Sequence, residues 1–425
     1  MQYRAAKGMN DILPDELRRW RTLEEAFRRT VELAGYAELR TPLLEATELF
    51  VRSVGESTDI VQKEMFTLQH HGDSLTLRPE GTASAARAYV EHTVFAREPV
   101  TRWYYLGPMF RAERPQRGRY RQFYQAGAEI FGDPGPACDA EMIDMLYRLF
   151  VGLGITDVEV VVNSLGSAGV RERYRDVLRE HLEPNKGELS ETSQRRLGDN
   201  PLRILDSKAP RDQELVREAP PILDFLDDAD RAHWDALRAG LDALGVPYRA
   251  EPRLVRGLDY YTRTLFEFQS SQGGLGSQNA LGGGGRYDGM VADLGGPAAP
   301  AIGFALGLER ILLAMNPGED PKPSPCFIAP IGERATLEAL VLARSLRERG
   351  VPTDLDGRGT SMKSMLRRAN SRGARLAVLI GDQELDRGVF KVKDLAAHTE
   401  IDVPRATAAE QISELMARAP LEPAH

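Results

Sequence analysis

Residues 110–129, FRAERPQRGRYRQFYQAGAE, form the stretch around which the rest of the sequence is organised. Beyond Gly118 the stretch alternates like a β-strand, so every second residue from Arg121 to Glu129 shares one face. That face carries a cation, an aromatic ring, an amide, a gap and a carboxylate: Arg121, Phe123, Gln125, Gly127 and Glu129. An ordinary strand buries an apolar face, and this succession of chemistries instead predicts the floor of a binding site. A solvated basic hairpin is the alternative that the stretch alone leaves open.

The residues before this stretch predict a strand that pairs with it. Residues 100–110, VTRWYYLGPMF, are aromatic and β-prone. They would run antiparallel to the first strand, joined to it by the loop at 112–119.

The composition is that of a soluble globular protein with two or three domains in 425 residues. No apolar run is long enough to cross a membrane, and the first residues lack the apolar core of a secretory signal. Two cysteines, Cys138 and Cys326, predict neither a disulfide framework nor a zinc site, so a cytoplasmic location is expected. The net charge of −8 argues against a general nucleic-acid coat but not against a local basic surface.

Helices and strands are predicted on both sides of the central hairpin. Pro14 begins an amphipathic helix that ends at Gly35. Residues 36–44 predict a strand that Pro42 confines to a sheet edge or a subunit contact, and both readings stay open. Residues 75–82, LTLRPEGT, predict a strand turning into an alanine-rich helix. At that junction Glu80 and Thr82 are default candidates for helix capping.

The middle of the chain predicts an interrupted domain. A helix at 138–152 and a strand at 158–162 come first, followed at 167–247 by a charged, proline-broken helical insertion. Strand character returns at 254–268. The glycine-rich residues 273–289 contain GGGGRYDG, which predicts either a flexible loop or close approach of the backbone to a ligand. Residues 301–313 predict a strand running into a helix that carries Glu309 and Arg310.

A second domain is predicted beyond a proline-rich linker at 316–325. From residue 326 strands alternate with helices, which is typical of a small α/β domain, and Lys and Arg outnumber Asp and Glu up to residue 400.

Five segments together resemble the histidyl-tRNA synthetase family of class II aminoacyl-tRNA synthetases. The helix with the Pro42 segment, FRAERPQRGRYRQFYQ and GFALGLERILL are similar to class motifs 1, 2 and 3. RGLDYYT at 256–262 and GGGGRYDG at 282–289 are similar to two signatures specific to histidine. The resemblance implies an α+β fold: a catalytic domain at 1–320 with an antiparallel sheet flanked by helices and a helical insertion, and an anticodon-binding α/β domain at 325–425. It also implies a homodimer formed through motif 1.

The resemblance implies a two-step reaction. The carboxylate of L-histidine attacks the α-phosphorus of ATP to give histidyl-adenylate and pyrophosphate. The 3′-hydroxyl of the terminal adenosine of tRNA(His) then accepts the histidyl group. Magnesium is expected on the phosphates of ATP, with no metal held by the protein alone.

The resemblance also assigns roles to residues. Arg256 and Arg111 are the catalytic candidates, both at the α-phosphate and the histidine carboxylate. Arg119 and Arg310 would hold the outer phosphates, Phe123 would stack on adenine, and Glu113 would accept from its amino group. The histidine ammonium would meet Glu80, Gly81, Thr82 and Gln125. Its ring would meet Glu129 and Tyr261, with Tyr260 and Tyr287 lining the pocket.

One alternative shares the catalytic fold. A regulatory subunit of ATP phosphoribosyltransferase, in histidine biosynthesis, has this fold without synthetase activity. Such paralogues typically lack the C-terminal domain and lose the ATP and histidine motifs, whereas Arg111, Arg256 and Arg310 are all present here. A pure RNA-binding module would leave the complete set of motifs unexplained.

Overall fold

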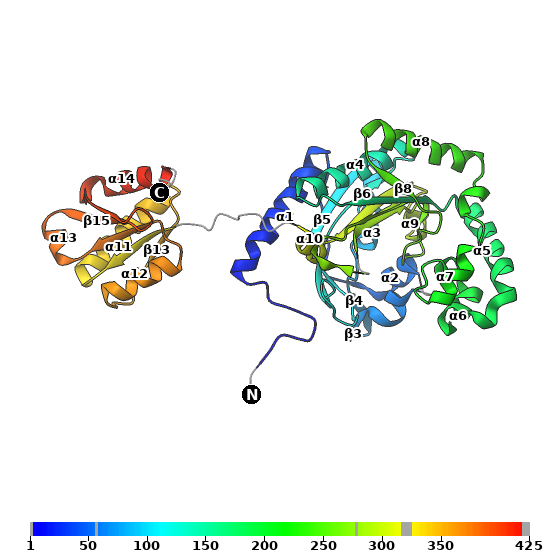
Figure 1. Ribbon diagram of the computed structural model, residues 1–425, viewed down its shortest axis with the longest axis horizontal. Helices are drawn as coiled ribbons and strands as arrows, with labels where there is room; N and C mark the ends of the chain where they lie inside the picture. The colour runs from blue at the N-terminus through cyan, green and yellow to red at the C-terminus, as the bar shows by residue number, and fades with distance from the viewer. Residues whose placement is uncertain (1–2, 56–57, 277–278, 316–324, 419–425) are drawn as a thin grey trace. The chain divides into compact units, whose positions relative to one another are not determined.

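A computed structural model describes residues 3–55, 58–276, 279–315 and 325–418, and the chain divides into two compact units, Met1–Gly318 and Glu319–His425 (Figure 1). The linker predicted at 316–325 lies, apart from Pro325, outside the described residues.

The first unit is built on an eight-stranded sheet in the order β1-β5-β6-β11-β10-β9-β7-β8. Its strands are β1 (Ala37–Glu38), β5 (Thr101–Phe110), β6 (Gln122–Phe131), β7 (Glu159–Ser164), β8 (Tyr248–Ala250), β9 (Thr262–Gln269), β10 (Ala280–Arg286) and β11 (Ala301–Gly307). Neighbours are antiparallel except the outermost pairs, β1 with β5 and β7 with β8. The predicted antiparallel sheet is therefore confirmed, and β5 and β6 are the predicted pair, with Tyr105 opposite Gly127.

The two faces of β6 have different surroundings, as its period of two predicts. Ala126, Ala128 and Ile130 face the main hydrophobic core. That core is covered by α1 (Pro14–Leu33), α4 (Pro136–Gly152), α8 (Asp228–Leu244) and α10 (Leu308–Ala314). The predicted apolar stripe of α1 is buried there at Trp20, Leu23, Phe27 and Val31. On the opposite face Phe131 packs with Tyr89 of α3 (Thr82–Glu91), and this face carries the cavity described below.

Two strand predictions need correction. The strand predicted at 36–44 is divided around Pro42, because proline cannot donate to a ladder. β1 stays in the large sheet, whereas β2 (Leu44–Ala46) joins β4 (Asp73–Leu77) and β3 (Phe66–His70) in a separate sheet of order β2-β4-β3. The strand predicted from residue 254 begins only at Thr262, because residues 251–261 form an irregular loop with tertiary partners of its own.

The glycine run is a strand and not a flexible loop. It is β10, paired on both sides, and its glycines allow close approach to those neighbours. A Cβ atom at Gly284 would lie 1.9 Å from the carbonyl oxygen of Gly303, and one at Gly283 would lie 2.7 Å from Nη1 of Arg256. Because these glycines have no side chains, β10 leaves room for the side chain of Arg256.

The predicted insertion contains α5 (Ala168–Leu182), α6 (Glu191–Asp199) and α7 (Pro210–Arg217), which group together in Figure 1. They share a second core with residues of the irregular loop and β9, including Leu254, Tyr261 and Leu265. The last helix of the segment, α8, packs instead against α4 and contributes Trp234, Leu237 and Leu241 to the main core. Two short helices, α2 (Thr47–Val54) and α9 (Met290–Asp293), complete this unit.

The second unit is the predicted α/β domain. Its sheet has the order β13-β12-β14-β15-β16, parallel from β13 to β14 and antiparallel beyond. The strands are β12 (Cys326–Pro330), β13 (Thr353–Leu355), β14 (Leu376–Ile380), β15 (Val389–Asp394) and β16 (Thr399–Pro404). The helices are α11 (Glu333–Glu348), α12 (Met362–Ser371), α13 (Asp382–Asp386) and α14 (Ala408–Ala417). Within the described ranges of both units, none of the helices combines the length and apolarity that a bilayer span requires.

Candidate active site

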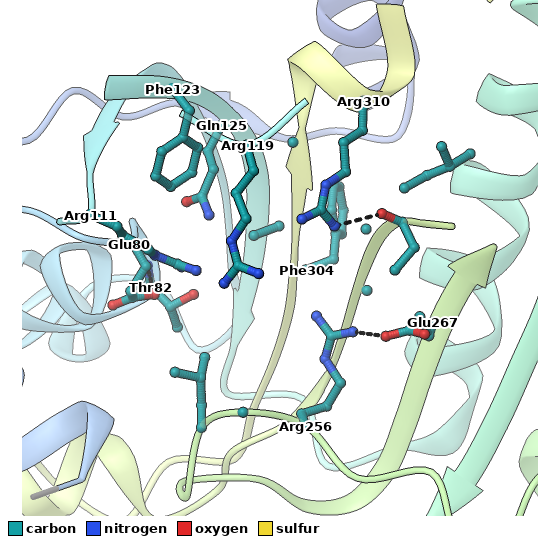
Figure 2. A pocket seen from close by; sticks show the side chains of 18 of the residues that line it. Glu80, Thr82, Arg111, Arg119, Phe123, Gln125, Arg256, Glu267, Phe304 and Arg310 are labelled. Carbon is teal, nitrogen blue, oxygen red and sulfur yellow. Dashed lines mark hydrogen bonds and ion pairs between the residues drawn. The ribbon is translucent and has the colours of Figure 1, made fainter. Parts of the chain in front are cut away.

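A cavity of about 400 Å³ opens on the face of the sheet that carries Phe123 and Gln125. Most of the residues selected from the sequence line it: Glu80, Thr82, Arg111, Glu113, Arg119, Phe123, Gln125, Arg256, Tyr260, Tyr261, Tyr287 and Arg310. They come from the start of α3 and the residues before it, the central hairpin, the irregular loop, the end of β10 and the start of α10, which are far apart in the chain. Figure 2 shows the guanidinium groups of Arg119, Arg256 and Arg310 directed into one space.

Arg111 leaves the end of β5 and is held in place from two sides. Its Nε donates to the carbonyl oxygen of Pro79 at 2.9 Å, and its guanidinium lies 5.3 Å from the centre of the Phe123 ring. The aromatic face and the carbonyl fix the plane of the guanidinium, as a residue that binds phosphate oxygens bidentately requires.

Arg119 and Arg310 complete a cluster of like charges. Arg119 forms an ion pair with Glu113, and Arg310 donates to the carbonyl oxygen of Ala280 at 3.0 Å. Burial lowers the pKa of Arg310, and the positive charges of Arg119 and Arg111 lower it further. Because guanidinium groups repel one another in a partly dry site, the cluster is suited to a bound polyanion.

Arg256 is aimed by a residue that the sequence analysis missed. Glu267 on β9 forms an ion pair with Arg256, and both side chains line the cavity (Figure 2). Burial opposes the charge of Arg256, but the carboxylate of Glu267 and the neighbouring tyrosines raise its pKa overall. The available signal was alternation: Phe266 and Phe268 face the main core, so the carboxylate between them faces the cavity.

Glu129 lies under the cavity floor and is fully buried. Its Oε1 accepts from the hydroxyls of Thr82 at 2.8 Å and Tyr105 at 3.1 Å, and its Oε2 accepts from Tyr287 at 2.5 Å. Burial raises the pKa of Glu129 to about 8, although the three hydroxyl donors oppose the shift.

Tyr105 was also missed by the sequence analysis, although the glycine gap on β6 pointed to it. A Cβ at Gly127 would lie 2.4 Å from the Tyr105 ring, and one at Gly81 would lie 2.2 Å from it. The tyrosine opposite Gly127 therefore fills the gap, and Gly81 is needed for room beside its ring.

Glu80 and Gln125 offer polar groups at the other side of the cavity. Glu80 accepts from the backbone N–H groups of Thr82 and Ala83, both at 2.8 Å, so it does cap α3 while lining the cavity. Its burial raises its pKa. Gln125 Oε1 is buried and has no hydrogen-bond partner within the described part of the chain. Such an acceptor fits a ligand that donates, for example an ammonium group.

Arg121 differs from the other members of the predicted binding face. β6 begins one residue later, at Gln122, and the Nε of Arg121 donates to the carbonyl oxygen of Glu113 at 3.1 Å. Its side chain also packs close to Gly8. Arg121 therefore supports the loop of the hairpin and does not line the cavity.

Comparisons with known proteins find similar proteins over nearly the whole length of the chain. The family pattern described as "Histidyl-tRNA synthetase" matches residues 8–311, and the one described as "Anticodon binding domain" matches residues 325–415. A histidine–tRNA ligase of Sorangium cellulosum is 62% identical over 421 residues, covering 99% of this chain and 98% of the relative. One of Bacillus subtilis is 45% identical over 410 residues, covering 95% and 96%.

Solved structures give the same result. The apo histidyl-tRNA synthetase of S. aureus has a TM-score of 0.82 at 35% identity and covers 97% of this chain and 100% of its own. A Bacillus halodurans C protein titled as an ATP phosphoribosyltransferase regulatory subunit/histidyl-tRNA synthetase has a TM-score of 0.66 at 23% identity, covering 90% and 98%. At 23% identity that likeness shows the fold alone. The relatives of higher identity are histidine–tRNA ligases, so the regulatory alternative is not favoured. The family patterns and the full-length relatives show that the chain belongs to the histidyl-tRNA synthetase family of aminoacyl-tRNA synthetases.

Proposed function

We propose that the cavity carries out both steps of histidine–tRNA ligation, with ATP across the arginine cluster and histidine over Gln125 and Glu129. One observation carries this assignment: four arginines share a cavity with an amide oxygen that has no partner among the described residues, and a carboxylate is buried beneath its floor. A triphosphate matches the arginines, and a small zwitterion with a ring matches the polar floor.

Histidine is recognised by the polar floor. Its ammonium donates to Gln125 Oε1 and to Glu80, and its ring N–H points toward Glu129. A carboxylate has about four acceptor positions, and three hydroxyls occupy three of those on Glu129, which leaves one for the ring. Tyr260, Tyr261 and Tyr287 enclose the imidazole.

ATP binding exchanges an ion pair. Arg119 leaves Glu113 for the outer phosphates, which Arg310 also contacts, and the freed carboxylate accepts from the adenine amino group. Phe123 stacks on the base. The substrate is Mg·ATP, in which phosphate oxygens would supply most ligands of the ion, because Glu113 then accepts from adenine and Glu267 stays paired with Arg256.

In the first step the histidine carboxylate forms a bond to the α-phosphorus, and the bond to the β-phosphate oxygen breaks to release pyrophosphate. Arg111 and Arg256 stabilise the charge that builds on the non-bridging oxygens. In the second step the 3′-hydroxyl of the terminal adenosine attacks the activated carbonyl, loses its proton and releases AMP.

The direct test is histidine-dependent ATP–pyrophosphate exchange, measured with each of the other amino acids in parallel. Exchange is expected with histidine alone, because the other side chains leave Glu129 and its tyrosines without a matching ring donor. Absence of exchange with histidine would overturn the assignment and restore the regulatory alternative.

The C-terminal unit is proposed to bind the anticodon stem-loop of tRNA(His). A chain ending near Asp320 is expected to keep adenylate formation but to charge tRNA poorly. Binding of tRNA to the full chain should weaken steeply with salt, since cation contacts release counterions. Filter binding and aminoacylation of both chains check this, and unchanged charging by the shortened chain would refute it.

We further propose a cytoplasmic homodimer, as the resemblance of the Pro42 segment to motif 1 implies. Exposed apolar side chains in this segment support the dimer: Leu43 and Leu44, which follow Pro42, are 44% and 40% exposed. Sedimentation equilibrium is expected to give twice the mass of the chain.

A further inference from the structure

We infer that Arg171 and Asn200, both in the helical insertion, are positioning residues for the histidine pocket, so that the insertion acts in amino-acid activation before any tRNA is bound. This rests on the proposed function, since it concerns the loop that carries Arg256, Tyr260 and Tyr261.

The loop at 251–261 has little support from its own backbone. It contains no helix or strand. Three of its amide groups donate within described backbone: Glu251 to Val162, Leu254 to Glu251, and Asp259 to Val54 at a long 3.4 Å. A loop so held needs side-chain partners to keep one conformation.

Asn163 of β7 donates to the carbonyl oxygens of Pro252 and Leu254 at the start of the loop, and the insertion supplies partners for its second half. Arg171 of α5 donates through Nη1 to the carbonyl oxygens of Asp259 and Tyr261. Asn200, just beyond α6, donates through Nδ2 to the side chain of Asp259 at 2.9 Å. Arg203 donates to the carbonyl oxygen of Gly257 at 2.8 Å. The side chains of Arg171, Asn200 and Arg203 therefore form hydrogen bonds to the loop on both sides of Tyr260, within a few residues of Arg256.

Packing leads to the same conclusion. Tyr261 is buried in the insertion core with Leu178, Leu197 and Leu215, although it also lines the active-site cavity. Tyr260 lines that cavity too, and it lines a second cavity of about 560 Å³ together with Arg171 and Asp259. Tyr260 therefore lies between two cavities, and both hydrogen bonds and packing join the loop to the insertion.

The geometry sets the expected effect. Losing Arg171 frees two backbone carbonyls that flank Tyr260, so the tyrosines lose their fixed orientation while Arg111, Arg119 and Arg310 keep theirs. Histidine binding should suffer and ATP binding should not. A residue that only contacts tRNA would leave both substrates of tRNA-independent exchange unaffected.

The test is ATP–pyrophosphate exchange without tRNA, using the full chain and Arg171→Ala, Arg171→Lys and Asn200→Ala variants. The KM for histidine is expected to rise about 10-fold or more in Arg171→Ala, because small misplacements of substrate-positioning groups are costly. The KM for ATP should stay within about twofold, and Arg171→Lys should recover part of the loss, since an ammonium can still donate to a carbonyl.

Arg179→Ala is the matched control. It removes an arginine two turns further along α5 whose partners, Asp176 and Gly198, both lie in the insertion. It should leave the KM for histidine unchanged. If Arg171→Ala merely destabilised the protein, the active fraction would fall with both KM values unchanged.

The outcomes separate cleanly. Unchanged histidine KM in folded Arg171→Ala, with a defect confined to transfer to tRNA, overturns the inference. If Arg171→Ala does not fold, Asn200→Ala decides in the same way, because its target is also Asp259. A parent chain without histidine-dependent exchange overturns the proposed function itself and not this inference alone.

Discussion

Arg256→Ala is expected to slow single-turnover formation of histidyl-adenylate by ~10²–10³-fold, the usual loss when one preorganised charge at a transition state is removed. In the proposed mechanism Arg256 is the fixed cation where the histidine carboxylate meets the α-phosphate, and its ion pair with Glu267 orients it. Negative charge builds on the non-bridging oxygens as the nucleophile adds, so the cation should stabilise the transition state more than the bound substrates. Rapid-quench measurement of adenylate at saturating ATP and histidine checks this.

The affinity for ATP and the rate of transfer to tRNA show whether Arg256 acts in catalysis or in substrate binding. Affinity for ATP should change little, because Arg111, Arg119 and Arg310 remain, and transfer from preformed adenylate should suffer less than adenylation. Arg256→Lys should recover only part of the rate, since an ammonium lacks the planar fork. Poor ATP binding with a normal rate at saturation would make Arg256 a substrate-binding residue and contradict the mechanism.

Two further variants distinguish the effect of the Arg256 charge on the adenylation rate from the effect of its orientation. Glu267→Gln keeps Arg256 but removes the ion pair that orients its guanidinium, so an intermediate loss of adenylation rate is expected. Arg344→Ala is the control, because it removes an exposed arginine whose carboxylate partner, Glu348, lies with it on α11 of the second unit. It should leave the adenylation rate unchanged.

Glu129→Ala is expected to raise the KM for histidine far more than the KM for ATP, with a loss of ~1–3 kcal/mol for the imidazole donor left unpaired. Glu129→Gln should behave similarly, since an amide has fewer acceptor positions than a carboxylate. It also keeps the side-chain volume if the alanine variant is unstable. Steady-state exchange kinetics check both, and equal effects on the two substrates would refute the assignment.

The pH dependence gives a second readout for Glu129. The pKa of Glu129 is raised to about 8 by burial, so in the free enzyme the carboxyl is increasingly protonated below that pH. Its ionised form is the better acceptor, so kcat/KM for histidine should rise with pH through this range, and the step should vanish in Glu129→Gln. Glu32→Ala is the matched control: Glu32 accepts from the hydroxyl of Tyr104 at 2.7 Å, the residue next to Tyr105 on β5.

Much of the site could be predicted because the side chains that line it or lie beneath it recur at every second residue along one strand. The alternation from Phe123 to Glu129 holds in β6, and the paired strand at 101–110 follows from aromatic and β-branched content. Resemblance to the family then connected distant segments, which spacing cannot do. Glu267 and Tyr105 were missed because each is significant only through a partner on another element, Arg256 and Glu129 respectively.

The sequence by itself determined the local pattern: which face of β6 is polar, where α1 buries its stripe, and that a separate α/β unit follows residue 325. It could not decide whether four glycines form a loop or a strand, because glycine permits either and only the close backbones of β9 and β11 select the strand. Nor could it show that Arg171 and Asn200 hold the Tyr260 loop. Those contacts join residues 59 to 90 positions apart, and they exist only after the insertion has packed against β9. Tertiary structure decides such features because a side-chain hydrogen bond depends on where two chains meet in space, which local spacing does not encode.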